Sequence, residues 1–149
     1  MTPLKIGACL KAHEIADHRT WLFGATRDID LQDFMTHAAL STEFEGRIAA
    51  AKAALDGHTG RIGIHGPFEG LDIANKDAEL RPIIAAQFLK ALKATDQVGT
   101  RQMVIHSPFS AWYQNSIFNF PDYAAINMLA FTRDLDIWCA PPRIKASRW

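Results

Sequence analysis

Short apolar runs alternate along the chain with longer stretches of helical periodicity. Four short runs have the pattern of β-strands, at residues 4–9, 27–31, 61–65 and 102–106. The segments between them repeat apolar residues at the three- and four-residue spacing of a helical face. These helices are predicted over residues 13–23, after a cap at Ser41 or Thr42, and from Asp77 or Leu80 onward. Strands that alternate with helices predict parallel pairing, right-handed crossovers and an α/β fold.

The turn after the first predicted strand excludes the common nucleotide-binding motifs. Gly7-Ala8-Cys9 matches neither the glycine-rich dinucleotide fingerprint nor the P-loop. A (β/α) barrel remains, and in that architecture the carboxyl ends of the strands carry the functional residues. The position of Cys9 at the end of a strand predicts buried packing for its side chain.

A short repeat closes the third and fourth predicted strands. Residues 64–68 read Ile-His-Gly-Pro-Phe and residues 105–109 read Ile-His-Ser-Pro-Phe, so His65 recurs as His106 after 41 residues. This offset is about one βα unit of an eight-unit barrel of roughly 250 residues. We therefore expect the two histidines at the same level on neighbouring strands, which lie about 4.8 Å apart. Such a pair can bind one metal ion, two neighbouring metal ions or an anionic substrate.

The residues around this repeat have alternative interpretations. A single histidine at a strand end is most simply a hydrogen-bonded structural residue, whereas two in the same context favour a functional pair. Phe68 and Phe109 either pack the rim of the sheet or form the wall of a pocket for a sugar ring. Asp30 and Gln32 lie near the end of the second strand, where they reach the same edge or remain in a solvated loop.

Composition narrows the class of protein. The 149 residues include 16 Lys and Arg and 16 Asp and Glu, and 48 % are hydrophobic, so a globular domain is expected rather than a disordered chain. No apolar run has the length of a membrane span and no signal peptide is visible. Two cysteines are too few for a disulfide scaffold, which favours a cytoplasmic protein. Zero net charge removes the electrostatic argument for a nucleic-acid partner.

With these motifs in view, residues 4 to about 110 resemble the sugar-phosphate isomerase/epimerase group of xylose-isomerase-like TIM barrels. That group also includes the endonuclease IV type of abasic-site nuclease. The segments that carry the resemblance are residues 5–8 (KIGA), 27–34 (RDIDLQDF), 64–73 (IHGPFEGLDI), Arg81 with the helix around it, and 104–106 (VIH). The resemblance implies an α/β chain that forms an incomplete (β/α) TIM barrel, with about four parallel strands and alternating helices.

The resemblance also implies a divalent metal ion (Zn, Mn or Mg) at the carboxyl ends of the strands. His65 and His106 match its ligands, and Asp30 stands where relatives carry an acid, which makes it the expected catalytic residue. The expected substrate contacts are Phe68, Gln32 and Phe109. The remaining ligands of the family come from later strands. Residues 1–135 match the amino-terminal half of the barrel, whereas residues 136–149 have two prolines and no glutamate at a strand end.

This tail predicts a truncated or frameshifted chain with little or no activity alone. The leading hypothesis is a metal-dependent sugar or sugar-phosphate isomerase or epimerase, which moves a proton on the carbon next to a carbonyl while the metal stabilises the enediolate. One alternative is an endonuclease IV-like phosphodiesterase. A non-enzymatic alternative is a half-barrel that self-associates through its open sheet edges. The expected partners are a sugar or sugar phosphate and a second copy of the chain, with no membrane.

Overall fold

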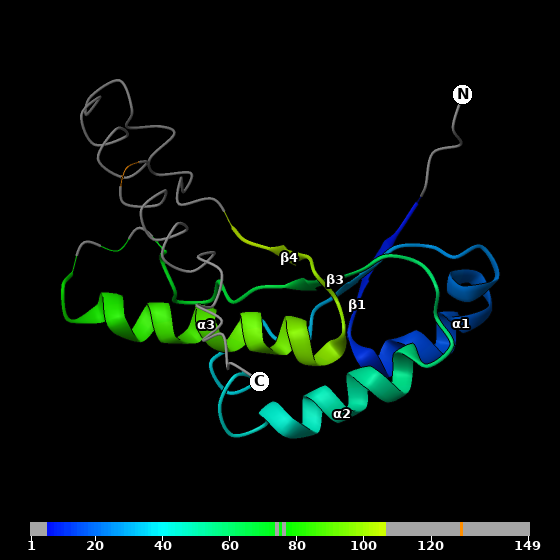
Figure 1. The fold of residues 1–149 in the computed structure, drawn as a ribbon, viewed down its shortest axis with the longest axis horizontal. Helices are drawn as coiled ribbons and strands as arrows, with labels where there is room; N and C mark the ends of the chain where they lie inside the picture. The colour runs from blue at the N-terminus through cyan, green and yellow to red at the C-terminus, as the bar shows by residue number, and fades with distance from the viewer. Residues whose placement is uncertain (1–5, 74, 76, 107–128, 130–149) are drawn as a thin grey trace, which may run out of the picture.

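The computed structural model describes residues 6–73, 75, 77–106 and 129 (Figure 1). The predicted boundary at residue 135, the tail 136–149 and the candidate residue Phe109 lie outside these residues. Residues 4 and 5 of the first predicted strand also lie outside them.

A four-stranded parallel sheet forms the centre of the described chain. The strands are β1 (Ala8–Leu10), β2 (Ile29–Leu31), β3 (Ile62–His65) and β4 (Met103–Val104), and they follow one another in the sheet in chain order. The connections contain a 3₁₀ turn, η1 (Ala12–Glu14), and the helices α1 (Ile15–Gly24), α2 (Phe44–Leu55) and α3 (Leu80–Val98). The three helices lie along one side of the sheet (Figure 1). The α/β class and the parallel strands are confirmed.

The alternation of residues along the strands explains why the helices cover one face. Ile29, Leu31 and Ile64 are buried in the main core cluster, which also includes Ile15 and Leu22 of α1. Each apolar side chain of this size stabilises the fold by about 1.5–3 kcal/mol when it is fully buried. The intervening positions of the strands point to the other face of the sheet.

The first residues of α2 and α3 can be compared with the positions that the sequence predicted. Ser41 or Thr42 as the cap of α2 is wrong, because the residue before the helix is Glu43 and no side chain caps it. The hydroxyl of Ser41 instead donates to the carbonyl of His37 at 2.7 Å, within the turns that precede the helix. Of the two starts proposed for α3, Leu80 is confirmed. Pro82 then falls in the first turn, where its missing N–H leaves no helical bond unmade.

The register of β3 and β4 corrects the expected level of the histidines. The sheet pairs Ile64 with Met103 and His65 with Val104, so His106 lies two residues beyond the level of His65. Equal levels of the two histidines were predicted because the repeat gives only their separation along the chain. The backbone hydrogen bonds decide the register instead, and the Gly66 N–H donates to the Val104 carbonyl at 2.8 Å. The strand predicted over residues 102–106 is correspondingly shorter in the structure.

Candidate functional site

Three side chains from the strand ends meet at the carboxyl edge of the sheet. Asp30 is in β2, His65 is the last residue of β3, and His106 follows β4. Parallel strands present their carboxyl ends at one edge, which is why residues so far apart in the sequence come together. The structure thus brings the predicted acid and both predicted metal ligands into one group.

The hydrogen-bond partners of His65 favour one tautomer of its neutral ring. Nδ1 of His65 lies 2.9 Å from Oδ2 of Asp30, and Nε2 of His65 lies 2.8 Å from Nε2 of His106. An ionised carboxylate only accepts hydrogen bonds, so the proton of a neutral His65 is on Nδ1. Its Nε2 then has a free lone pair, and His106 donates its Nε2–H to that atom. The side chains of His65 and Asp30 are only 16 % and 21 % exposed.

An aromatic side chain completes this group. The ring of Phe68 stacks on the ring of His106, with centroids 4.2 Å apart and planes 7° from parallel. The same phenyl ring meets His65 edge to face, at a centroid distance of 5.6 Å. Phe68 was predicted from the resemblance as a substrate contact, and the structure adds its contacts with both histidines.

Cys9 is a member of the site that the sequence did not reveal. It was expected to pack in the core, but it is exposed. The sheet register pairs it with Asp30, whose position on the strand faces the same side. Partial burial, the charge of Asp30 and a hydrogen bond to that carboxylate together raise the pKa of the Cys9 thiol. The prediction was wrong because alternation alone does not show which face of β1 the helices cover.

Gln32 and Phe109 were also predicted to contact substrate, and the structure describes only Gln32. Gln32 directly follows β2, and its backbone N–H donates to the Leu10 carbonyl at 3.0 Å. Within residues 6–106, as far as they are described, no hydrogen bond links the Gln32 side chain to either histidine. Phe109 falls outside the described residues, so its predicted role stays a prediction.

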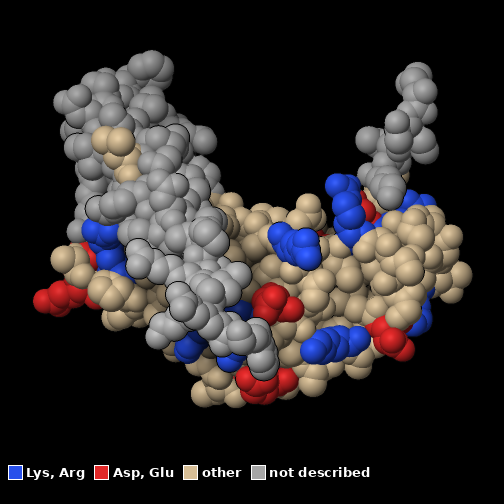
Figure 2. Space-filling model, viewed as in Figure 1, with Lys and Arg blue, Asp and Glu red and all other residues tan. Residues whose placement is uncertain are grey.

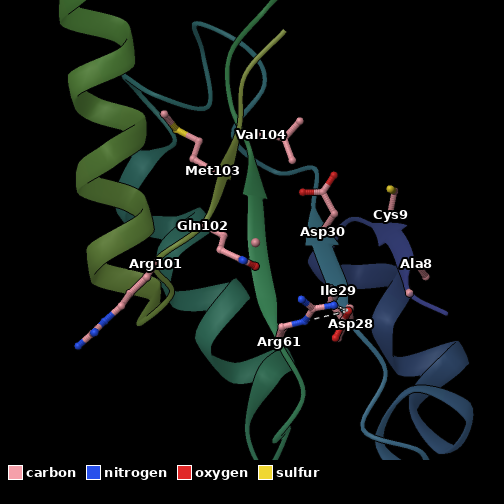
Figure 3. A pocket seen from close by; sticks show the side chains of 12 residues that line it. Ala8, Cys9, Asp28, Ile29, Asp30, Arg61, Arg101, Gln102, Met103 and Val104 are labelled. Atoms are coloured by element: carbon pink, nitrogen blue, oxygen red, sulfur yellow. Dashed lines mark hydrogen bonds and ion pairs between the residues drawn. The ribbon is translucent and has the colours of Figure 1, made fainter. Parts of the chain in front are cut away.

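A hollow of about 600 Å³ lies on the face of the sheet opposite the helices (Figure 3). Cys9, Asp30 and Gly63 line it. Toward the amino ends of the strands, Arg61 reaches across to Asp28 and binds its carboxylate (Figure 3). Asp30 therefore borders this hollow and also contacts His65. On the molecular face in Figure 2, the basic and acidic side chains of the described residues are interspersed.

The donor atoms of the histidine pair suit a transition metal. Imidazole nitrogens are common ligands of Zn, and two of them on one tetrahedral ion at about 2.0–2.1 Å lie about 3.3 Å apart. The observed separation of 2.8 Å is that of a hydrogen bond, so binding of one ion by both nitrogens would require the Nε2 proton of His106 to move to its Nδ1 and the two nitrogens to separate by about 0.5 Å. A carboxylate behind a ligating histidine is the usual arrangement of metal sites, because it fixes the tautomer of the ring. Among the described residues no group of three or more His, Cys, Asp or Glu is arranged to hold a metal ion.

Comparison of the chain with protein-family models, with curated proteins and with solved structures found no match. Of the helices that the structure describes, none is long and apolar enough to cross a membrane.

Proposed function

We propose that this chain is part of a metal-dependent sugar or sugar-phosphate isomerase or epimerase with a xylose-isomerase-like (β/α) barrel. The observation that carries the proposal is the contact of His65 with His106 in front of Asp30. It supplies two adjacent imidazole ligands, one of them oriented by a carboxylate, at the end of the sheet where barrel enzymes have their active sites.

The topology of the sheet supports the barrel in this proposal. The strands follow in chain order and the helices lie on one side, as they do along any arc of a (β/α) barrel. A doubly wound sheet instead reverses its strand order and has helices on both faces. A four-stranded arc is half of an eight-stranded barrel.

The chemistry of the proposal assigns a role to each residue. His65 and His106 would hold the metal ion, and the remaining ligands would come from outside the described residues. The bound metal supplies Lewis-acid stabilisation to the oxygen that becomes negative when a proton leaves the neighbouring carbon. Because Asp30 contacts His65 through Oδ2, it acts through that ring by fixing the proton on Nδ1. We therefore assign Asp30 a positioning role in place of the direct catalytic role expected from the resemblance.

Metal titration of the full 149-residue chain tests the proposal first. We expect calorimetry to show binding of zinc or manganese that His65→Ala and His106→Ala each abolish. His18→Ala, which removes an exposed histidine of α1, serves as the matched control and keeps the binding of the unaltered chain. Absence of metal binding by the unaltered chain, or equal binding by all variants, would overturn the proposed metal site.

Activity assays then separate the reaction classes. The metal-loaded chain is offered sugar phosphates in an epimerisation assay and an abasic DNA duplex in a nicking assay. Because the remaining ligands lie outside the described residues, the proposal expects little turnover in either assay, and any weak turnover is expected with the sugars and only when both histidines are present. Nicking without epimerisation would place the chain in the hydrolytic class instead.

A further inference from the structure

We propose that Phe68 is a positioning residue that fixes the imidazole ring of His106, so that the segment after β3 holds both histidines. The role in metal binding rests on the proposed function, whereas the fixing of the ring does not. This inference gives Phe68 a role in the protein itself, beyond the substrate contact that the resemblance implies.

The position of His106 explains why its ring needs support from elsewhere. β4 ends at Val104, and among the described residues the last hydrogen bond that joins the ends of β3 and β4 is the one from Gly66 N–H to the Val104 carbonyl. His106 lies two residues further along and is exposed. An exposed side chain beyond the end of a strand has several staggered rotamers open to it.

Two side chains hold the ring of His106 in one rotamer. One belongs to His65, the last residue of β3, and the other to Phe68, which follows that strand. His65 accepts the Nε2 hydrogen of His106 at 2.8 Å, which fixes one edge of the ring. Phe68 covers one face of the same ring at 4.2 Å and 7°. A hydrogen bond alone allows rotation about its own axis, and the stacked phenyl ring removes that freedom. In the metal-free chain the pair of contacts therefore sets both the position and the plane of the imidazole, and the stacked ring is the contact that would remain when both Nε2 atoms bind a metal ion.

The backbone between these two residues is suited to hold Phe68 in place. Gly66 and Pro67 are buried, and Pro67 is among the largest fully buried residues. The N–H of Gly66 is bonded to the Val104 carbonyl at 2.8 Å, and the ring of Pro67 fixes the φ angle of Pro67 itself, directly before Phe68. A Cβ at position 66 would lie 2.8 Å from that carbonyl oxygen, so glycine allows β3 and β4 to approach here. Phe68 thus extends from a rigid segment that is bonded to the neighbouring strand.

Proton NMR of the full chain together with zinc titration tests this inference. The ring protons of His106, assigned by their loss in His106→Gln, lie in the shielding region above a phenyl ring. Phe68→Leu keeps an apolar side chain but removes the ring, so we expect these protons to move downfield and zinc affinity to fall about tenfold, the lower end of the range for outer contacts of metal ligands. Phe68→Tyr keeps the ring and is expected to preserve both values.

A second aromatic–histidine pair of the same chain provides the control. Phe23 contacts His58 at a centroid distance of 4.8 Å. Phe23→Leu is expected to shift the protons of His58 and to leave those of His106 and the zinc affinity unchanged. If Phe68→Leu leaves the His106 protons in place, the inference is overturned. If those protons move and zinc affinity is unchanged, the positioning role in metal binding is overturned and the proposed function stands. If the unaltered chain binds no zinc, the proposed function fails, and the NMR shifts alone decide whether Phe68 fixes the ring.

Discussion

Nε2 of His65 lies 2.8 Å from Nε2 of His106, whereas the sheet pairs His65 with Val104. The contact is therefore made by the side chains across an offset of two residues. Paired residues of parallel strands face the same side of a sheet, so Val104 faces the side of His65. Because β4 ends at Val104, the place of the His106 ring is defined by its contacts with His65 and Phe68.

Asp30→Asn tests the orientation of His65. The amide oxygen still accepts a hydrogen bond from Nδ1, but it has no negative charge to fix the proton there. We expect affinity for zinc to fall about 10- to 100-fold, as is usual when the outer partner of a ligating histidine is altered. Calorimetry measures the change, and Asp17→Asn on the exposed side of α1 is the control. Equal affinities for both variants would show that Asp30 does not act through His65.

Gly66→Ala tests the close approach of β3 and β4. The new Cβ would lie 2.8 Å from the Val104 carbonyl oxygen and 3.3 Å from Cγ of Met103. We expect the free energy of unfolding to fall by about 1–3 kcal/mol, the usual cost of overpacking. Urea denaturation measures it.

Gly46→Ala is the matched control for that substitution. Gly46 lies in α2, and a Cβ there would meet nothing within 4 Å. Alanine in a helix interior is more favourable than glycine by about 0.5–1 kcal/mol, so this variant is expected to be more stable. A loss of stability in both variants would contradict the steric explanation at Gly66.

The burial of Asp33 predicts that its contribution to stability is lost as the pH rises. Its side chain is only 8 % exposed, its Oδ2 accepts the Ala12 N–H at 2.8 Å, and Arg47 lies 3.9 Å away. Burial raises the pKa of the carboxyl group and outweighs the lowering by Ala12 and Arg47. The folded state therefore binds the proton more tightly than the unfolded state, in which the pKa is about 3.9. The stability from this group is fully present below that value and is lost as the pH rises through the folded pKa.

Asp33→Asn removes this titration and keeps an acceptor for Ala12. We expect the unaltered chain to lose stability relative to the variant as the pH rises above about 4. Urea midpoints of both proteins across a pH series measure the difference. A difference that changes in the opposite direction would mean that the attraction of Arg47 outweighs burial.

Arg19→Lys tests the link between α1 and the end of α2. The guanidinium donates to the carbonyls of Ala54 and Asp56, at 3.2 and 2.6 Å, and lies 4.0 Å from the ring of Phe23. Lysine does not reproduce this fork, so we expect a loss of about 1 kcal/mol in the free energy of unfolding. Thermal or urea denaturation measures it. Arg101→Lys, at an exposed position before β4, is expected to have no effect, and an equal loss there would contradict the assignment.

The elements of this fold were largely predictable from local pattern. The helical spacing of Phe44, Ile48, Ala51 and Leu55 identified α2, and all four side chains are buried in it. Pro82 placed the start of α3 at Leu80 because a proline is tolerated in the first turn of a helix. The cap of α2 was not predictable, because the hydroxyl of Ser41 has a local alternative in the His37 carbonyl.

The sequence by itself determined the alternation of strands and helices, the repeat of His65 as His106, and the presence of an acid at the end of β2. These properties depend on the order and spacing of residues along the chain. The tertiary structure decided the register of β3 and β4, the contact of the two rings, the stacking of Phe68 and the exposure of Cys9. Each of these depends on backbone hydrogen bonds and packing between segments distant in sequence, which residue spacing alone does not specify.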